Sequence, residues 1–130
     1  MIWRIDHSQL PGYLKVSVEG KASLSEYQML WAEIVDSKDW EPGTPILKDI
    51  RGREPLGPEG FQIVHGIAEI LSGEQARIGE SLVAIVANED EGFRYGRVLE
   101  YAVRIRNSEV VIRTFGSEQS AIDWLSQNNQ

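Results

Sequence analysis

The chain has 130 residues, 42% of them hydrophobic and 25% charged, and none of them is cysteine. This is the profile of one globular domain, and the lack of cysteine excludes disulfides, thiolate nucleophiles and cysteine-ligated metals. With 20 acidic and 13 basic residues the net charge is -7, which disfavours binding to nucleic acid. No apolar run reaches the roughly 20 residues of a membrane span, and residues 1–6 do not resemble a signal peptide. We therefore expect a soluble cytoplasmic protein.

The first 20 residues predict a β-hairpin. Residues 2–6 and residues 13–19 both alternate between apolar and polar side chains, as strands with one covered face do. Leu10, Pro11 and Gly12 between them form a turn sequence, because proline presets its own φ angle and glycine tolerates a positive one. We expect the two strands to pair in antiparallel fashion.

Three of the four predicted helices begin with a capping pattern. Ser23 and Glu26 form a capping box, Asn88 with Glu91 repeats its logic, and Ser117 stands before the last helix. Each predicted helix also carries one apolar stripe at helical spacing. The stripes are Leu24, Tyr27, Leu30, Trp31 and Ile34; Phe61, Val64, Ile67, Ala68 and Leu71; Tyr95, Val98, Leu99, Ala102 and Ile105; and Ala121, Ile122, Trp124 and Leu125.

Strands alternate with these helices along the rest of the chain. The further strands are predicted at residues 46–50, 81–87 and 110–115, and the helices at residues 24–37, 58–72, 91–107 and 117–125. Residues 51–57 are predicted as a polar loop. The order ββαβαβαβα indicates an α/β fold with a mostly parallel five-stranded sheet, an antiparallel N-terminal edge strand and four helices.

The predicted topology also leads us to expect a symmetric homodimer. Right-handed crossovers place the connecting helices on one face of a sheet, so we expect the four helices to cover one face. Residues 81–87 are apolar at nearly every position, which indicates a central strand that needs cover on both faces. A two-fold contact can bury the remaining face, with Trp3, Tyr13 and Trp40 as anchors.

Four short motifs in a fixed order mark the chain. They are Glu19-Gly20 before a capped helix; Asp-Ile-Arg-Gly at residues 49–52; the strand 83–87 followed by residues 93–97; and residues 111–115 followed by residues 121–125. In these motifs the chain resembles the SpoIIAA-like branch of the STAS superfamily and, more loosely, its SEC14-related short cytosolic members. The resemblance covers nearly the whole chain, so it implies one domain over residues 1–130. It also implies a regulatory, protein-binding role without enzymatic activity.

One departure from the family's pattern affects this expectation. In STAS antagonists of anti-sigma factors, a serine that follows an aspartate after this strand is phosphorylated by a partner kinase. Asp49 matches the aspartate, but Ile50 and Arg51 stand where hydroxyls would be, and residues 49–71 contain no Ser, Thr or Tyr. A phosphoryl switch cannot operate there without an acceptor oxygen. We therefore expect a STAS-type interaction module that lacks the phosphorylatable serine.

Two groups of arginines are candidate binding residues. Arg51 and Arg53 follow Asp49 at the carboxyl end of a predicted parallel strand, where open α/β sheets bind ligands. Two arginines there can clamp an anion or a carboxylate. The alternative function is therefore a small-molecule or lipid-binding domain with an anion site near Arg51. The other interpretation of these arginines is a solvated pair balanced by Asp49, Glu54 and Glu59.

Arg94, Arg97 and Arg104 fall near one line of the third long helix, with Tyr101 between them. In an acidic protein such a basic line is a candidate surface for a protein partner. The competing interpretation is a solvated helix face, on which Glu91 and Glu100 form helical ion pairs with the arginines.

No sequence pattern points to catalysis, a cofactor or a metal ion. His7 and His65 are the histidines of the chain, and no spacing joins them as metal ligands. The acidic run at residues 89–91 is explained by the helix that starts there, because a helix dipole favours acidic groups at its N-terminus. Nucleophile elbows, phosphate loops and dinucleotide fingerprints are missing from the sequence. We expect a non-enzymatic protein.

Overall fold

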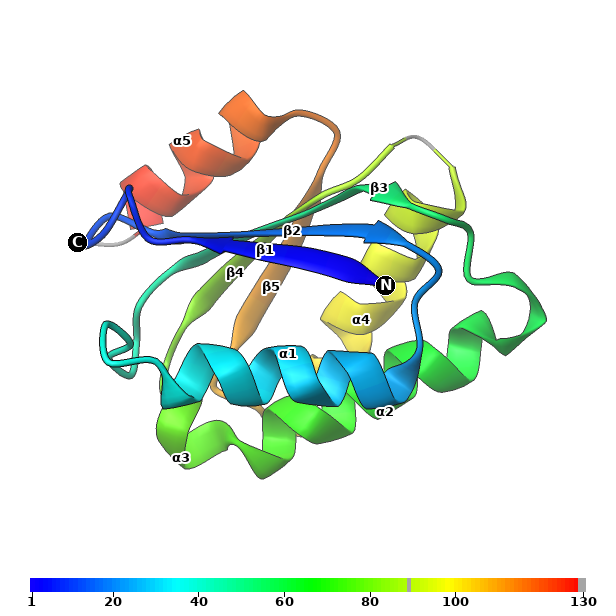
Figure 1. Cartoon of the computed structure of the whole chain (residues 1–130), viewed down its shortest axis with the longest axis horizontal. Helices are drawn as coiled ribbons and strands as arrows, with labels where there is room; N and C mark the ends of the chain where they lie inside the picture. The colour runs from blue at the N-terminus through cyan, green and yellow to red at the C-terminus, as the bar shows by residue number, and fades with distance from the viewer. Residues whose placement is uncertain (89, 129–130) are drawn as a thin grey trace.

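The computed structural model describes residues 1–88 and 90–128, which form a five-stranded sheet in the order β1-β2-β3-β4-β5 (Figure 1). The strands are β1 (Ile2–Asp6), β2 (Leu14–Gly20), β3 (Ile46–Arg53), β4 (Leu82–Val86) and β5 (Val111–Phe115). Strands β1 and β2 pair in antiparallel fashion, and the other three pairs are parallel. The predicted sheet, with its antiparallel N-terminal edge strand, is confirmed.

The four predicted helices are present together with two short helical turns. The long helices are α1 (Leu24–Asp36), α2 (Gly60–Gly73), α4 (Glu91–Ile105) and α5 (Glu118–Asn128). The additional turns are the 3₁₀ turn η1 (Gly57–Glu59) and the single-turn α3 (Gln75–Ile78). Among the residues that the structure describes, no helix has the length and apolar character needed to cross a membrane.

Two of the predicted helix caps are confirmed. The Ser23 hydroxyl oxygen accepts a hydrogen bond from the backbone N–H of Glu26 at 3.4 Å, and the hydroxyl donates to the Glu26 carboxylate at 2.6 Å. At the start of α5, Ser117 accepts from the backbone N–H of Ser120 at 3.2 Å. The two bonds to the serine hydroxyl oxygens each satisfy a backbone amide that the helix itself leaves without a partner.

The predicted cap of α4 by Asn88 and Glu91 is wrong. Asp90 is the capping residue, and its carboxylate accepts from the backbone N–H of Gly92 at 2.7 Å. Glu91 is free for a tertiary contact, in which its carboxylate accepts from the backbone N–H groups of Leu56 and Gly57. This contact holds the segment before η1 against the start of α4.

The two faces of the sheet are covered by different helices. Helices α1, α2 and α4 pack on one face and bury the larger core, which includes Tyr27, Ile46, Ile67, Ile85 and Leu99. Helix α5 packs on the opposite face, as Figure 1 shows with α5 (red) above the sheet and α1 and α2 below it. The smaller core under α5 consists of Leu47, Ala84, Val86, Ala121 and Leu125.

This position of α5 overturns the premise of the dimer argument, which placed all four helices on one face. The handedness rule constrains a helix that connects two parallel strands, and α5 follows the last strand, so it is free to return over the second face. The anchors are also used within the chain. Trp3 donates its indole N–H to Glu33 at 2.7 Å, and Trp40 donates to the carbonyl of Arg77 at 2.8 Å. The homodimer stays a prediction, without the exposed apolar face that motivated it.

Three residues assigned to the apolar stripes are exposed. Leu24 at the start of α1 is 39% exposed. Phe61 of α2 is 57% exposed and Ile105 of α4 is 53% exposed, while Ile63 and Val103 are buried in place of these two. In α2 and α4 the buried stripe is rotated about the helix axis relative to the predicted one, so it includes Ile63 and Val103 in place of Phe61 and Ile105. The Phe61 ring stacks on His65 with 5.2 Å between ring centroids, so His65 lies in a surface aromatic pair.

Candidate functional site

The carboxyl end of β3 differs from the predicted polar loop, because the strand continues to Arg53. Ser17 of β2 pairs with Asp49, but Glu19 pairs with Gly52, so β3 holds one residue more than β2 over this stretch. Such a bulge reverses the alternation of side chains beyond it. Arg51 lies before this reversal and Arg53 after it, so the two arginines point to opposite faces of the sheet.

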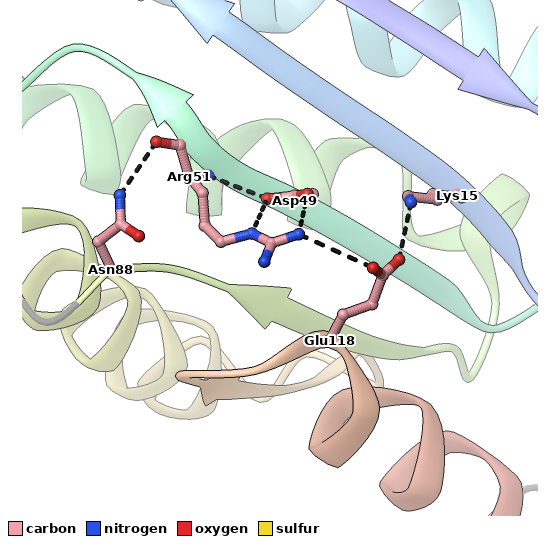
Figure 2. Close-up of polar contacts among 5 residues, drawn as sticks. All are labelled: Lys15, Asp49, Arg51, Asn88 and Glu118. Atoms are coloured by element: carbon pink, nitrogen blue, oxygen red, sulfur yellow. Dashed lines mark hydrogen bonds and ion pairs between the residues drawn. The ribbon is translucent and has the colours of Figure 1, made fainter.

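Arg51 lies on the α5 face within a network of polar contacts (Figure 2). Its Nε and Nη2 groups donate to the two oxygens of the Asp49 carboxylate at 3.0 and 2.8 Å. Its Nη2 also lies 3.8 Å from Glu118 at the start of α5, and Glu118 pairs with Lys15 Nζ at 2.7 Å. The backbone carbonyl of Arg51 accepts from the Asn88 side chain at 3.1 Å, which ties β3 to the end of β4.

The charges of this network cancel, since it contains two cations and two carboxylates. Burial alone would raise the pKa of Asp49, but the hydrogen bonds and charge of Arg51 hold that pKa below its ordinary value. The hydrogen bond from Lys15 to Glu118 raises the pKa of Lys15, and the bond to Asp49 raises that of Arg51. Lys15, Asp49 and Arg51 are therefore charged at neutral pH. An anion could reach Arg51 only by competing with carboxylates that already bind it.

Arg53 lies on the other face, where it meets a buried lysine that sequence reasoning missed. Arg53 Nη1 donates to the Tyr27 hydroxyl at 2.8 Å, and Lys48 Nζ lies 4.2 Å from the centroid of the Tyr27 ring. Lys48 is only 4% exposed, and burial together with the charge of Arg53 lowers its pKa to about 7. A signal was present in the sequence, because Lys48 stands between Ile46 and Ile50 at an inward-facing position of a strand.

The arginines of α4 form a separate group on the outer surface. Arg94, Arg97 and Arg104 are all exposed, and they share one side of the helix with Tyr101, which is 61% exposed. Arg97 Nε lies 3.6 Å from Glu100, whose carboxylate also accepts from the backbone N–H of Thr114 at 3.1 Å. The structure thus places the three predicted arginines on one helix surface. That surface lies on the opposite side of the sheet from Arg51.

Within the described ranges, no three His, Asp or Glu side chains gather where they could hold a metal ion. His65 stacks on Phe61, and His7 Nε2 lies 3.4 Å from the Ser37 hydroxyl. Of the acidic run at residues 89–91, residue 89 lies outside the described residues, and the other two form the cap and loop contacts given above.

Comparison with known proteins gives a match in structure and none in sequence. No protein-family model matches the chain, and no curated protein matches it. A solved structure does match, that of an uncharacterised protein of the DUF3478 family with a SpoIIAA-like fold from Shewanella loihica PV-4. The superposition covers 95% of this chain and 92% of the other, with a TM-score of 0.57. The fold is SpoIIAA-like. The two sequences are 20% identical, so the match establishes the SpoIIAA-like fold expected from the sequence and carries no statement about function.

Proposed function

We propose that this SpoIIAA-like domain is a non-enzymatic regulatory module that binds an acidic protein partner through the outer side of α4. The observation that carries the proposal is the surface formed by Arg94, Arg97, Tyr101, Arg104 and Ile105, called the α4 surface below. These residues recur at intervals of three and four, so they form one continuous strip along the helix.

The composition of the α4 surface is that of a binding surface. Tyr101 and Ile105 expose 61% and 53% of their area, so apolar side chains lie within a strip of guanidinium groups. Arginine and tyrosine are enriched where proteins bind one another, and an apolar centre with a polar rim is the usual arrangement. Arg97 Nε lies 3.6 Å from the Glu100 carboxylate, and the chain as a whole is acidic. A partner with surface carboxylates complements this strip.

Regulation through phosphorylation after β3 is not part of the proposal. The segment from residue 49 to residue 71 contains no Ser, Thr or Tyr, and Arg51 is already bound to Asp49. We expect no phosphorylated residue other than a histidine in this segment when the protein is purified from its source cells and mapped by mass spectrometry. The alternative function, a small-molecule or lipid-binding domain with an anion site at Arg51, has less support because the network around Arg51 is electrically neutral.

Charge reversal tests the α4 surface. Wild-type protein and the R94E/R97E variant are used as baits in source-cell extract, with R4E/R113E as the matched control. Arg4 on β1 and Arg113 on β5 are exposed, so the control carries the same change in charge at other places. We expect a protein that is recovered with wild type and control but lost with R94E/R97E. The purified partner should then bind in calorimetry, with an affinity that falls as salt rises.

Equal recovery of every protein by all three baits contradicts the proposal. So does a purified partner whose affinity for R94E/R97E equals that for the wild type, because the α4 surface then contributes nothing to binding.

A further inference from the structure

Lys48 is a buried cation in the middle of the sheet. It lies on the central strand β3, on the face covered by α1, α2 and α4, and it is 4% exposed. Within the described part of the chain, no carboxylate or hydrogen bond offsets its burial, and the charge that acts on it is that of Arg53. Buried ammonium groups are costly unless a counter-charge accompanies them. An anion bound beside Lys48 would offset this cost.

Arg53 adds a second cation, which forms no ion pair with a carboxylate among the residues that the structure describes. Its guanidinium donates to the Tyr27 hydroxyl at 2.8 Å, and burial raises the pKa of Tyr27, so the phenol stays neutral. Both cations thus lie around one tyrosine, with Lys48 against the ring and Arg53 at the hydroxyl. This is the reverse of the Arg51 network, in which two carboxylates match two cations.

A small cavity adjoins the two cations. Lys48 and Arg53 line it together with Tyr95 of α4 and apolar side chains that include Ile50, Val64 and Leu99. Its volume is about 10 Å³, so it holds a single small occupant. The groups that face Lys48 from α2 and β4 are apolar. The other charged or titratable groups nearby are Arg53 and Tyr95, which line the cavity, and Tyr27, whose ring Lys48 contacts.

We propose that this cavity binds one small monovalent anion, of the size and charge of chloride, between the Lys48 ammonium and the Arg53 guanidinium. The two cations supply the charge, and the apolar walls favour an ion that gives up its hydration water easily. The volume excludes an organic acid from the site as it stands. The site is independent of the α4 surface, so either proposal can fail without the other.

Binding should depend on pH because one of the two cations titrates near neutrality. The pKa of Lys48 is about 7, so the ammonium is present below that pH and is lost above it. The affinity for the anion should fall by up to about tenfold for each pH unit above this pKa.

The test uses the NMR line width of the chloride nucleus, which broadens when chloride exchanges with a protein site. The full chain is titrated at constant ionic strength, with gluconate as the replacement anion, at about pH 6 and about pH 9. The variant K48M removes the charge and keeps a side chain of similar length among apolar walls. The control R51M removes an arginine of the neutral network on the opposite face.

We expect the wild type and R51M to broaden the chloride line at the lower pH, and bromide but not acetate to reverse the effect. K48M should lose at least about tenfold in affinity, because a charge-assisted contact is removed. Equal broadening by K48M and wild type would overturn the site. So would broadening that is unchanged between the two pH values, a result that needs only the unmodified protein. Displacement by acetate as effective as by bromide would contradict the size of the occupant.

Discussion

Asp49 and Lys48 are neighbours on β3, and they show two ways in which one strand of a SpoIIAA-like domain accommodates a charged side chain. On the α5 face, Asp49 is bound by Arg51 and the surrounding charges cancel. On the opposite face, Lys48 and Arg53 lie together without a carboxylate in the described part of the site. The first arrangement stabilises the fold at neutral pH, and the second costs stability in return for a site. Neighbouring substitutions should therefore have effects of opposite sign.

The largest effect is expected for K48M. Methionine removes the buried ammonium and keeps the apolar contacts, and replacement of buried charges by apolar side chains of similar volume often stabilises by about 1–4 kcal/mol. We expect the free energy of unfolding at pH 7 to rise by about 2 kcal/mol in chloride-free buffer, measured by urea denaturation. A loss of stability would mean that Lys48 has a structural partner, and the contrast between the faces would not hold.

The pH dependence of wild-type stability also tests whether the buried charge of Lys48 destabilises the fold. The pKa of Lys48 is lowered from 10.5 to about 7 in the folded protein, so between these values the unfolded chain binds more protons. The free energy of unfolding should therefore rise with pH above 7, by up to about 1.4 kcal/mol per unit. Below pH 7 Lys48 should add no dependence on pH, because its buried charge then destabilises the fold to the full extent. Near pH 10 Tyr27, whose pKa burial raises, acts in the opposite direction. Denaturation curves at several pH values check this, and K48M should abolish the rise.

A smaller effect of opposite sign is expected for D49N. The substitution removes the carboxylate that accepts from Arg51, which is partly exposed, so solvent reduces the loss to about 1 kcal/mol. The pKa of Asp49 is lowered in the folded state, so its contribution is present above its ordinary value of 3.8 and is lost as the pH falls below it. The stability difference between wild type and D49N should accordingly vanish in acid. A difference that persists there would assign the effect to packing.

The smallest effect on stability is expected for R94E/R97E. Both side chains are exposed, and exposed substitutions usually change stability by less than about 0.5 kcal/mol. The thermal midpoint should stay within a few degrees of the wild type, measured by circular dichroism. Unfolding of the variant would make these arginines structural and remove them as a binding surface.

The sequence predicted the elements and their order because each depends on local patterns. The buried α1 positions Tyr27, Leu30, Trp31 and Ile34 and the caps at Ser23 and Ser117 are examples. The separation of Arg51 from Arg53 could not be predicted, since it depends on how β3 pairs with β2. Gly52 is a local sign of this shifted pairing, because a Cβ atom there would lie 2.8 Å from Cγ of Glu19 on β2.

The face of the sheet on which α5 packs could likewise not be predicted from the sequence. A helix that follows the last strand has no second parallel strand to reach, so no handedness rule applies to it. Its apolar residues Ala121 and Leu125 were recognised as buried, but the pattern does not say on which face they lie. The candidate site at Lys48 was within reach, since alternation along β3 places that lysine inward.

The contact between Glu100 and Thr114 affects how readily one molecule can associate with another through the edge of its sheet. Strand β5 ends the sheet, and an end strand presents unpaired amides to which a strand of another molecule can add. Glu100 reaches from α4 and occupies the amide of Thr114, and it brings Arg97 close to the same place. A strand that approached this border would have to displace a carboxylate from its hydrogen bond. Helix α4 thus hinders edge-to-edge pairing of β5 with a strand of another molecule, and it does so through Glu100, which is not part of the apolar stripe of the helix.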